Sequence, residues 1–346
     1  MAHELGIAVV GVGYWGPNLI RNFSLAEGWD LRWVCDLDGD RAARAVGKRS
    51  TVEVTSSIDD VLDDLDVDAV AIATPAHTHA ELAIRALDAG KHVLIEKPLA
   101  ASVAEGEKMV SVAEDRGLVL MCDHTYCFTP AVREIRRAVQ SGEVGDLQYF
   151  DSVRVNLGLV QSDVDVFWDL APHDLSILDF ILPPGVLPTG VAAYGADPLG
   201  VGQACLGYLS LPLCNGGMAH AHVNWLSPTK IRTTIIGGSE RMIVWDDLHP
   251  TQRLSVYDKG ISLTADLDPK RQRDTLVSYR IGDMVAPALP EQEALRGVVG
   301  EFRASIVEHR RPATDGQAGL RILRILEAAT RSFRGQGVLE QLEEAM

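Results

Sequence analysis

The sequence lacks the features that would point to a membrane protein or a disulfide framework. No apolar run approaches the ~20 residues that a membrane-spanning helix needs. The N-terminus has neither a basic region nor a long apolar segment, so we expect no signal peptide. The five cysteines are odd in number and form no CxxC pair, which favours buried free thiols. We therefore expect a cytoplasmic protein.

Basic residues are scarce relative to acidic ones. Lys and Arg number 32 against 48 Asp and Glu, for a formal net charge of -16. Such a surface repels phosphate, so neither nucleic acid nor an anionic membrane is an expected partner.

The 346 residues, 47% of them hydrophobic, suit roughly two domains that each bury a core.

A glycine-rich turn follows the first apolar run of the chain, Ile7–Val10. Gly11, Gly13 and Gly16 have the GxGxxG spacing of a dinucleotide-binding unit, and a helical pattern follows them. In that unit the first glycine makes the tight turn and the second lets the backbone approach a pyrophosphate. The third lets the helix pack against the strand. The spacing therefore predicts a strand, turn and helix that bind a diphosphate at the helix N-terminus.

Asp36 supports this interpretation. It ends the next predicted strand, Leu31–Cys35, twenty residues after Gly16. An acid at that position accepts hydrogen bonds from an adenosine ribose and repels a 2′-phosphate, so NAD is the expected cofactor and NADP the alternative. The competing interpretation is that Asp36 is a helix N-cap or turn residue.

Polar side chains also follow the later predicted strands. Ala69–Ala73 leads into Thr74-Pro75, Val93–Ile95 leads into Glu96-Lys97, and Leu118–Met121 precedes Asp123-His124. Ligands bind outside the carboxyl ends of strands in open α/β sheets, so these groups are expected at a binding crevice. A surface ion pair is the alternative for Glu96 and Lys97. His77 and His79 lack partners with metal-ligand spacing, so no metal site is predicted.

The second half of the chain predicts a different architecture. Short strands between 191 and 246, separated by Pro, Gly and Asn turns, favour an open, mostly antiparallel sheet. The polar side chains that alternate along 219–224 form a substrate wall or a subunit interface. Asp169 and His173 lie four residues apart on a predicted helix, 167–182, and therefore share one face. The alternative for that pair is an ordinary helix-surface contact.

Together these motifs resemble the Gfo/Idh/MocA oxidoreductases. The resemblance rests on GxGxxG with its acid, Thr74–His79, Gly90–Pro98, His124, and the Asp-x-x-x-His spacing of Asp169 and His173. It implies an α/β fold with an N-terminal Rossmann doubly wound parallel sheet, 1–125. A C-terminal α+β domain, 126–346, would follow, with its last helices packed back on the first domain. Asp123 stands where many relatives have glycine.

The resemblance also implies roles for individual residues. The catalytic residues would be Lys97, His173 and Asp169. The cofactor contacts would be Gly11, Gly13, Tyr14, Trp15, Gly16, Asp36, Thr74, Pro75, His79, Glu96, Lys97 and His124. The substrate contacts would be Lys97, Tyr126, Arg154, Asn156, Asp169 and His173.

The segments Tyr14–Leu19 and Arg154–Gly158 resemble a subgroup that acts on nucleotide-activated sugars. The implied activity is hydride transfer between nicotinamide and a ring hydroxyl or ketone, at C3, of a nucleotide sugar. A free sugar or inositol dehydrogenase, NAD-dependent glycoside cleavage and a non-catalytic NAD-binding regulator are the alternatives.

Large open sheets in such folds often pair, so a homodimer or homotetramer is expected.

Overall fold

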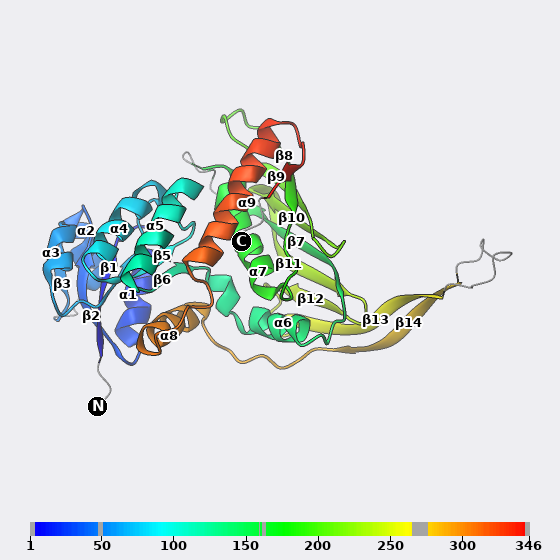
Figure 1. The fold of residues 1–346 in the computed structure, drawn as a ribbon, viewed down its shortest axis with the longest axis horizontal. Helices are drawn as coiled ribbons and strands as arrows, with labels where there is room; N and C mark the ends of the chain where they lie inside the picture. Colours follow the sequence, from blue (N-terminus) through cyan, green and yellow to red (C-terminus); the bar gives the residue numbers. More distant parts are fainter. Residues whose placement is uncertain (1–3, 48–50, 159, 161–163, 265–275, 343–346) are drawn as a thin grey trace. The chain divides into compact units, whose positions relative to one another are not determined.

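A computed structural model describes residues 4–47, 51–158, 160, 164–264 and 276–342 (Figure 1). The chain divides into two compact units. Unit 1 comprises Met1–Thr129 and Gln292–Glu327, and unit 2 comprises Pro130–Glu291 and Ala328–Met346. None of the helices in the described ranges combines the length and the apolar character that crossing a membrane requires.

The described part of unit 1 is built on a six-stranded parallel sheet with the order β3-β2-β1-β4-β5-β6. Its strands are β1 (Leu5–Val10), β2 (Trp29–Cys35), β3 (Glu53–Thr55), β4 (Ala69–Ile72), β5 (His92–Glu96) and β6 (Leu120–Asp123). The order reverses between β1 and β4, and ligands bind at such a reversal. The expectation of a doubly wound Rossmann sheet is confirmed.

Helices connect these strands and cover both faces of the sheet. The connections are α1 (Gly16–Leu25), α2 (Gly39–Val46), α3 (Ile58–Asp63), η1 (Ala76–Thr78), α4 (His79–Asp88) and α5 (Val103–Arg116), and η2 (Thr125–Phe128) follows β6. α1 packs beside α2 and the late helix α8 (Ala294–Val307), whereas α4 packs beside α5. Right-handed crossovers place these two groups on opposite faces. The strand interiors are consequently fully buried, as Val93, Leu94 and Ile95 show.

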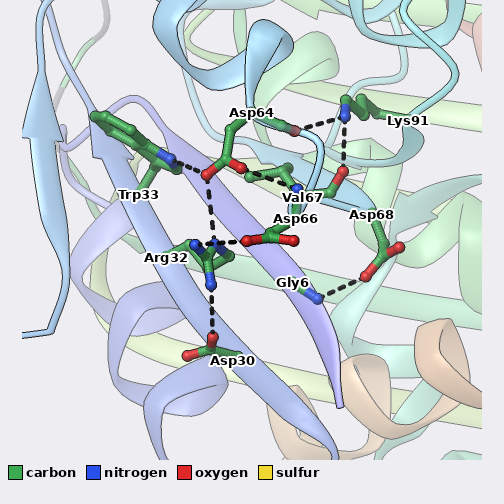
Figure 2. A network of polar contacts seen from close by, with 9 residues as sticks. All are labelled: Gly6, Asp30, Arg32, Trp33, Asp64, Asp66, Val67, Asp68 and Lys91. Atoms are coloured by element: carbon green, nitrogen blue, oxygen red, sulfur yellow. Dashed lines mark hydrogen bonds and ion pairs between the residues drawn. The ribbon is translucent and has the colours of Figure 1, made fainter. Parts of the chain in front are cut away.

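A polar network joins the amino-terminal ends of the strands in unit 1 (Figure 2). The Asp64 carboxylate accepts hydrogen bonds from Trp33 Nε1 at 2.7 Å and Arg32 Nε at 3.3 Å. Buried Lys91 donates to the carbonyl oxygens of Asp64 and Val67, both at 2.8 Å. These contacts connect β2, the segment before β4 and the segment before β5. The polar groups of this network thus hold neighbouring segments of unit 1 together.

Unit 1 is completed by residues from the end of the chain. Phe302 of α8 stacks on Trp29 with ring centroids 5.6 Å apart. Thr314 Oγ1 donates to the Cys122 carbonyl oxygen at 2.7 Å, next to the end of β6. The division between the units falls within the following helix, α9 (Gly316–Arg334).

The described part of unit 2 contains a nine-stranded sheet with the order β14-β13-β12-β11-β7-β10-β9-β8-β15. Its strands are β7 (Leu147–Leu157), β8 (Gly190–Ala196), β9 (Leu206–Pro212), β10 (Met218–Asn224), β11 (Leu226–Gly238), β12 (Met242–Asp246), β13 (Leu254–Thr264), β14 (Leu276–Val285) and β15 (Glu340–Gln341). Apart from the parallel pair of β7 and β10, its neighbours are antiparallel. The expected open, mostly antiparallel sheet is confirmed.

Two helices, α6 (Pro130–Gln140) and α7 (Val166–Ile181), pack on each other, and α7 contacts β7, β9 and β10. Sequence reasoning did not predict β13 or β14. The run Asp258-Lys259-Gly260 inside β13 is typical of a turn. Pairing with β12 and β14 overrides that local preference, and the register with β14 shifts between Tyr257 and Lys259.

Candidate functional site

The glycines after β1 form a cradle that larger residues would fill. Gly11 has a φ of 92°, and a Cβ there would lie 2.7 Å from the carbonyl carbon and oxygen of Ala73. A Cβ on Gly16 would lie 2.2 Å from the Gly11 carbonyl oxygen. A Cβ on Gly13 would meet nothing within 4 Å, so open space lies beside its backbone. This geometry fits a pyrophosphate at the start of α1.

Asp36 lies beside this cradle. Its Oδ2 accepts a hydrogen bond from the Val12 amide at 2.6 Å, and its Oδ1 accepts from the Asp38 amide at 2.9 Å. Arg41 also donates to Oδ1, at 2.7 Å. Burial opposes ionisation, but the amides of Asp38 and Val12 and the Arg41 guanidinium together lower the pKa of Asp36. Asp36 is therefore an ionised acceptor at the end of β2, as an adenosine ribose requires.

His79 connects the carboxyl ends of β4 and β5. Its Nδ1 lies 2.9 Å from the Pro98 carbonyl oxygen, and its Nε2 lies 2.8 Å from the Thr74 carbonyl oxygen. The ring is 1% exposed, and this burial lowers the pKa of His79. Thr74 Oγ1 in turn accepts a hydrogen bond from Thr78 at 2.7 Å. His79 thus holds the backbone that carries Thr74, Pro75 and the Lys97-Pro98 segment.

Four polar side chains lie at the carboxyl ends of the neighbouring strands β5 and β6. Glu96 and Asp123 are register partners across these strands, and Lys97 and His124 come next in the chain. Both His124 ring nitrogens and Glu96 Oε2 are buried without a hydrogen-bond partner among the described residues. Burial, followed by the charge of Lys97, lowers the pKa of His124 to about 3, so this ring is neutral.

These observations fit a bound nicotinamide dinucleotide. The cradle leaves space beside Gly13, Asp36 is ionised, and unpartnered buried polar atoms gather at the ends of β5 and β6. Buried polar groups are normally hydrogen-bonded, so atoms of this kind mark a place where a ligand can supply the partner. Tyr14 and Trp15 lie between Gly13 and Gly16, in the same glycine turn. Tyr14 is 95% exposed, and Trp15 is half-buried.

The predicted residues of unit 2 lie on α7 and β7. Asp165 caps α7 by accepting hydrogen bonds from the amides of Phe167 and Trp168 at 3.0 and 3.1 Å. Asp169 and His173 follow one turn apart on this helix, and both are half-buried. Trp225 Nε1 donates to Asp169 Oδ2 at 2.9 Å, which orients the carboxylate.

Arg154 has a structural partner in unit 2. Its Nε and Nη2 donate to Asp174 at 2.8 and 3.0 Å, and both side chains are almost fully buried. This bidentate pair attaches β7 to α7. Asn156 is half-buried near the end of β7, and Tyr126 of unit 1 is half-buried in η2. The substrate roles assigned to these residues stay predictions.

Two residues that contact predicted site residues had no predicted role of their own. Asp123, which the sequence placed at the crevice, receives hydrogen bonds from Trp15 Nε1 at 3.3 Å and Thr125 Oγ1 at 2.8 Å. Trp225 lies 56 residues from Asp169, and no local pattern indicates their contact.

Two further observations on the described residues limit the site. A hollow of about 450 Å³ in unit 1 is lined by His92, the segment Gly117–Leu120 and residues around Arg310. It lies at the amino ends of β5 and β6 and contains none of the predicted site residues. No group of three His, Cys, Asp or Glu side chains in the described ranges is placed to hold a metal ion.

Comparison with known proteins agrees with this geometry. Residues 5–124 match a family model, GFO_IDH_MocA, described as an oxidoreductase family with an NAD-binding Rossmann fold. The fold and the cradle therefore define an NAD-dependent oxidoreductase. The similarity also extends well beyond the matched domain, as the relatives below show. The chain therefore shares the NAD-binding domain of the Gfo/Idh/MocA oxidoreductases.

The relatives differ in how much of the chain they match. UDP-N-acetylglucosamine 3-dehydrogenase of Acidithiobacillus ferrooxidans is 29% identical over 316 residues, which cover 91% of this chain and 93% of that protein. Its solved structure superposes with a TM-score of 0.81 at 26% identity, covering 96% and 99% of the two chains. The scyllo-inositol 2-dehydrogenase (NAD(+)) of Bacillus subtilis is 28% identical over 204 residues, covering 56% and 58%.

Proposed function

We propose that the protein oxidises or reduces a ring carbon, at C3, of a nucleotide-activated sugar. The observation that carries this proposal is the nearly full-length similarity to a UDP-N-acetylglucosamine 3-dehydrogenase, in sequence and in structure. Oxidation of a free polyol is the second candidate, because an inositol dehydrogenase is also related. That similarity covers about half of each chain.

The residues of unit 1 would bind the cofactor and the reacting oxygen. Gly11, Gly13 and Gly16 would hold the pyrophosphate, and Asp36 would accept hydrogen bonds from the adenosine ribose. Bound NAD supplies the hydride acceptor, and its reduced form supplies the donor. Lys97, directly after β5, would donate a hydrogen bond to the reacting oxygen.

The residues of unit 2 would move the proton. The His173 imidazole would take the hydroxyl proton during oxidation and return it during reduction. Asp169, one helical turn earlier, would hold the ring in the required tautomer. Trp225 would keep the Asp169 carboxylate in place through the indole N–H.

The test uses the full chain with NAD and three kinds of substrate: UDP-N-acetylglucosamine, a dTDP-sugar and myo-inositol. Formation of NADH is followed by its near-ultraviolet absorbance. We expect turnover with a nucleotide sugar, loss of turnover in Lys97→Met, and retained turnover in Lys108→Met, which alters an exposed lysine of α5. Turnover of the polyol alone would support the second candidate. NAD binding without turnover of any sugar would identify a regulator.

We also propose that the sheet of unit 2 pairs with a second copy of the chain. Tyr194, Tyr208 and His222 are successive register partners on β8, β9 and β10, so they share one face. The rings of Tyr208 and His222 stack at 4.3 Å, and the two tyrosines remain 59% and 41% exposed. Exposed aromatic rows of this kind are typical of interfaces. Light scattering should show a dimer or tetramer that Tyr208→Glu weakens.

A cytoplasmic location is proposed as well. All five cysteines are free thiols, and four of them are buried. Thiols in that state are typical of a reducing compartment. Reporter fusions or fractionation of cells that produce the full chain would test this location.

A further inference from the structure

Two carboxyl groups face each other at the end of the parallel sheet of unit 1. Glu96 and Asp123 are register partners on neighbouring strands, so their side chains project from the same face. Neighbouring strands lie about 4.8 Å apart. Asp123 is 1% exposed, and Glu96 Oε2 is fully buried. Two carboxylates this close in a buried setting cannot both ionise readily.

The hydrogen-bond donors around the pair show which carboxyl holds the charge. Trp15 Nε1 and Thr125 Oγ1 both donate to Asp123, at 3.3 and 2.8 Å. Glu96 Oε2 has no donor among the described residues. Donors stabilise the ionised form, so the negative charge rests on Asp123. A proton on Glu96 lets this carboxyl donate a hydrogen bond to the ionised Asp123.

The other titratable groups around the pair are Lys97, Cys122, His124 and Cys127. The Lys97 ammonium favours ionised Glu96, but burial and then the Asp123 charge outweigh it and raise the pKa of Glu96 well above its usual value. Burial also raises the pKa of Asp123. It raises the pKa of the Cys122 thiol as well, and the nearby Cys127 adds to this second shift. His124 is neutral. Two buried carboxyls side by side in these surroundings therefore favour a single shared proton.

We propose that Asp123 and Glu96 hold one proton between them, and that Asp123 thereby keeps Glu96 neutral beside Lys97. Asp123 is then a positioning residue that acts on Lys97 through Glu96. The negative charge of the pair lies on Asp123, where Trp15 and Thr125 stabilise it. Lys97 then donates to the reacting oxygen beside a neutral Glu96 and not beside an ionised one. This last step rests on the proposed acid/base function of the site.

The shared proton can be measured without turnover. Infrared spectra of the full chain near neutral pH should show the carbonyl band of a protonated carboxylic acid, and Glu96→Gln should remove it. Asp123→Asn should remove it too, because the amide can donate to an ionised Glu96. Absence of the band in the wild type would overturn the proposal. Persistence of the band in Asp123→Asn would also overturn it, since burial alone would then protonate Glu96.

The effect on Lys97 is read from the pH profile of kcat/KM, with each variant normalised to its own maximum. Asp123→Asn should move the midpoint of the basic limb, where the donating ammonium is lost, up by about one pH unit, as a new carboxylate beside a cation does. The double variant Glu96→Gln/Asp123→Asn should move it back, which a merely structural defect would not allow. Asp115→Asn, at an exposed aspartate of α5, is the matched control.

The outcomes separate the two proposals. An unchanged midpoint in Asp123→Asn, with the infrared band lost, would overturn the action on Lys97. Retained turnover in Lys97→Met would refute the proposed function, while the infrared result would still decide the shared proton. If Asp123→Asn does not fold, loss of the band in Glu96→Gln still supports a protonated Glu96, and retention of the band overturns it.

Discussion

The buried His124 ring should make the stability of unit 1 depend on pH. Burial, and then the charge of Lys97, lowers the pKa of His124 to about 3 in the folded state, and the unfolded chain has the ordinary value near 6.5. Below about pH 6.5 the unfolded chain therefore binds a proton that the folded chain does not bind. Stability is lost as the pH falls through this window, from about 6.5 toward 3.

The magnitude follows from the width of the window. Each pH unit below 6.5 costs about 1.4 kcal/mol, so lowering the pH to about 5 should reduce the free energy of unfolding by about 2 kcal/mol. The raised pKa values of Glu96 and Asp123 act in the opposite direction, since their extra proton stabilises the folded state as the pH falls. A comparison with a variant that keeps both carboxyls isolates the histidine.

The assay is urea unfolding of the wild type and of His124→Gln, near pH 7.5 and near pH 5, followed by circular dichroism. Glutamine has an amide but does not titrate, so His124→Gln should lose about 2 kcal/mol less than the wild type between the two pH values. His77→Gln, at an exposed histidine of the same unit, is the control and should behave as the wild type does. Equal pH dependence in His124→Gln and the wild type would refute the reasoning.

Three further predictions concern binding and catalysis. Gly16→Ala should weaken NAD binding at least tenfold in calorimetry, because the added methyl group would lie 2.2 Å from a backbone carbonyl oxygen. Asp36→Ser should raise the kcat/KM for NADP relative to NAD by about tenfold or more. The change frees the Arg41 guanidinium, which lies 2.7 Å from the Asp36 carboxylate, to bind a 2′-phosphate. An unchanged ratio would contradict this prediction. Trp225→Phe should lower kcat/KM about tenfold without changing NAD affinity, because a hydrogen bond to a charged group contributes about 1.5–3 kcal/mol and here orients Asp169.

Much of unit 1 could be predicted because its signals are local. The conformation of Gly11 and the close approach of Gly16 to the backbone exclude a Cβ, and this constraint is visible as GxGxxG. Buried strands such as β5 appear as continuous apolar runs, since both faces are covered. In unit 2, by contrast, β13 contains a turn-like Asp-Lys-Gly run, so pairing with its neighbours decided its conformation.

The roles of several side chains could not be predicted from local pattern. The cofactor role of His79 stays a prediction, and the structure adds that its buried ring lies between two backbone carbonyls. The substrate role of Arg154 also stays a prediction, and the structure adds its pairing with Asp174, twenty residues later. Each outcome depends on which segments become neighbours, which the order of residues along the chain does not reveal.

Local sequence was enough to predict the class of fold, the glycine cradle, the acid at the end of β2 and the placement of Asp169 and His173 on one helix face. These properties depend on backbone sterics and on the 3.6-residue helical period, which act between residues close in the chain. The folded chain was needed to show that Glu96 lies opposite Asp123 and that Trp225 contacts Asp169. Strand order and register bring such pairs together, and the charge that a site carries follows from those contacts.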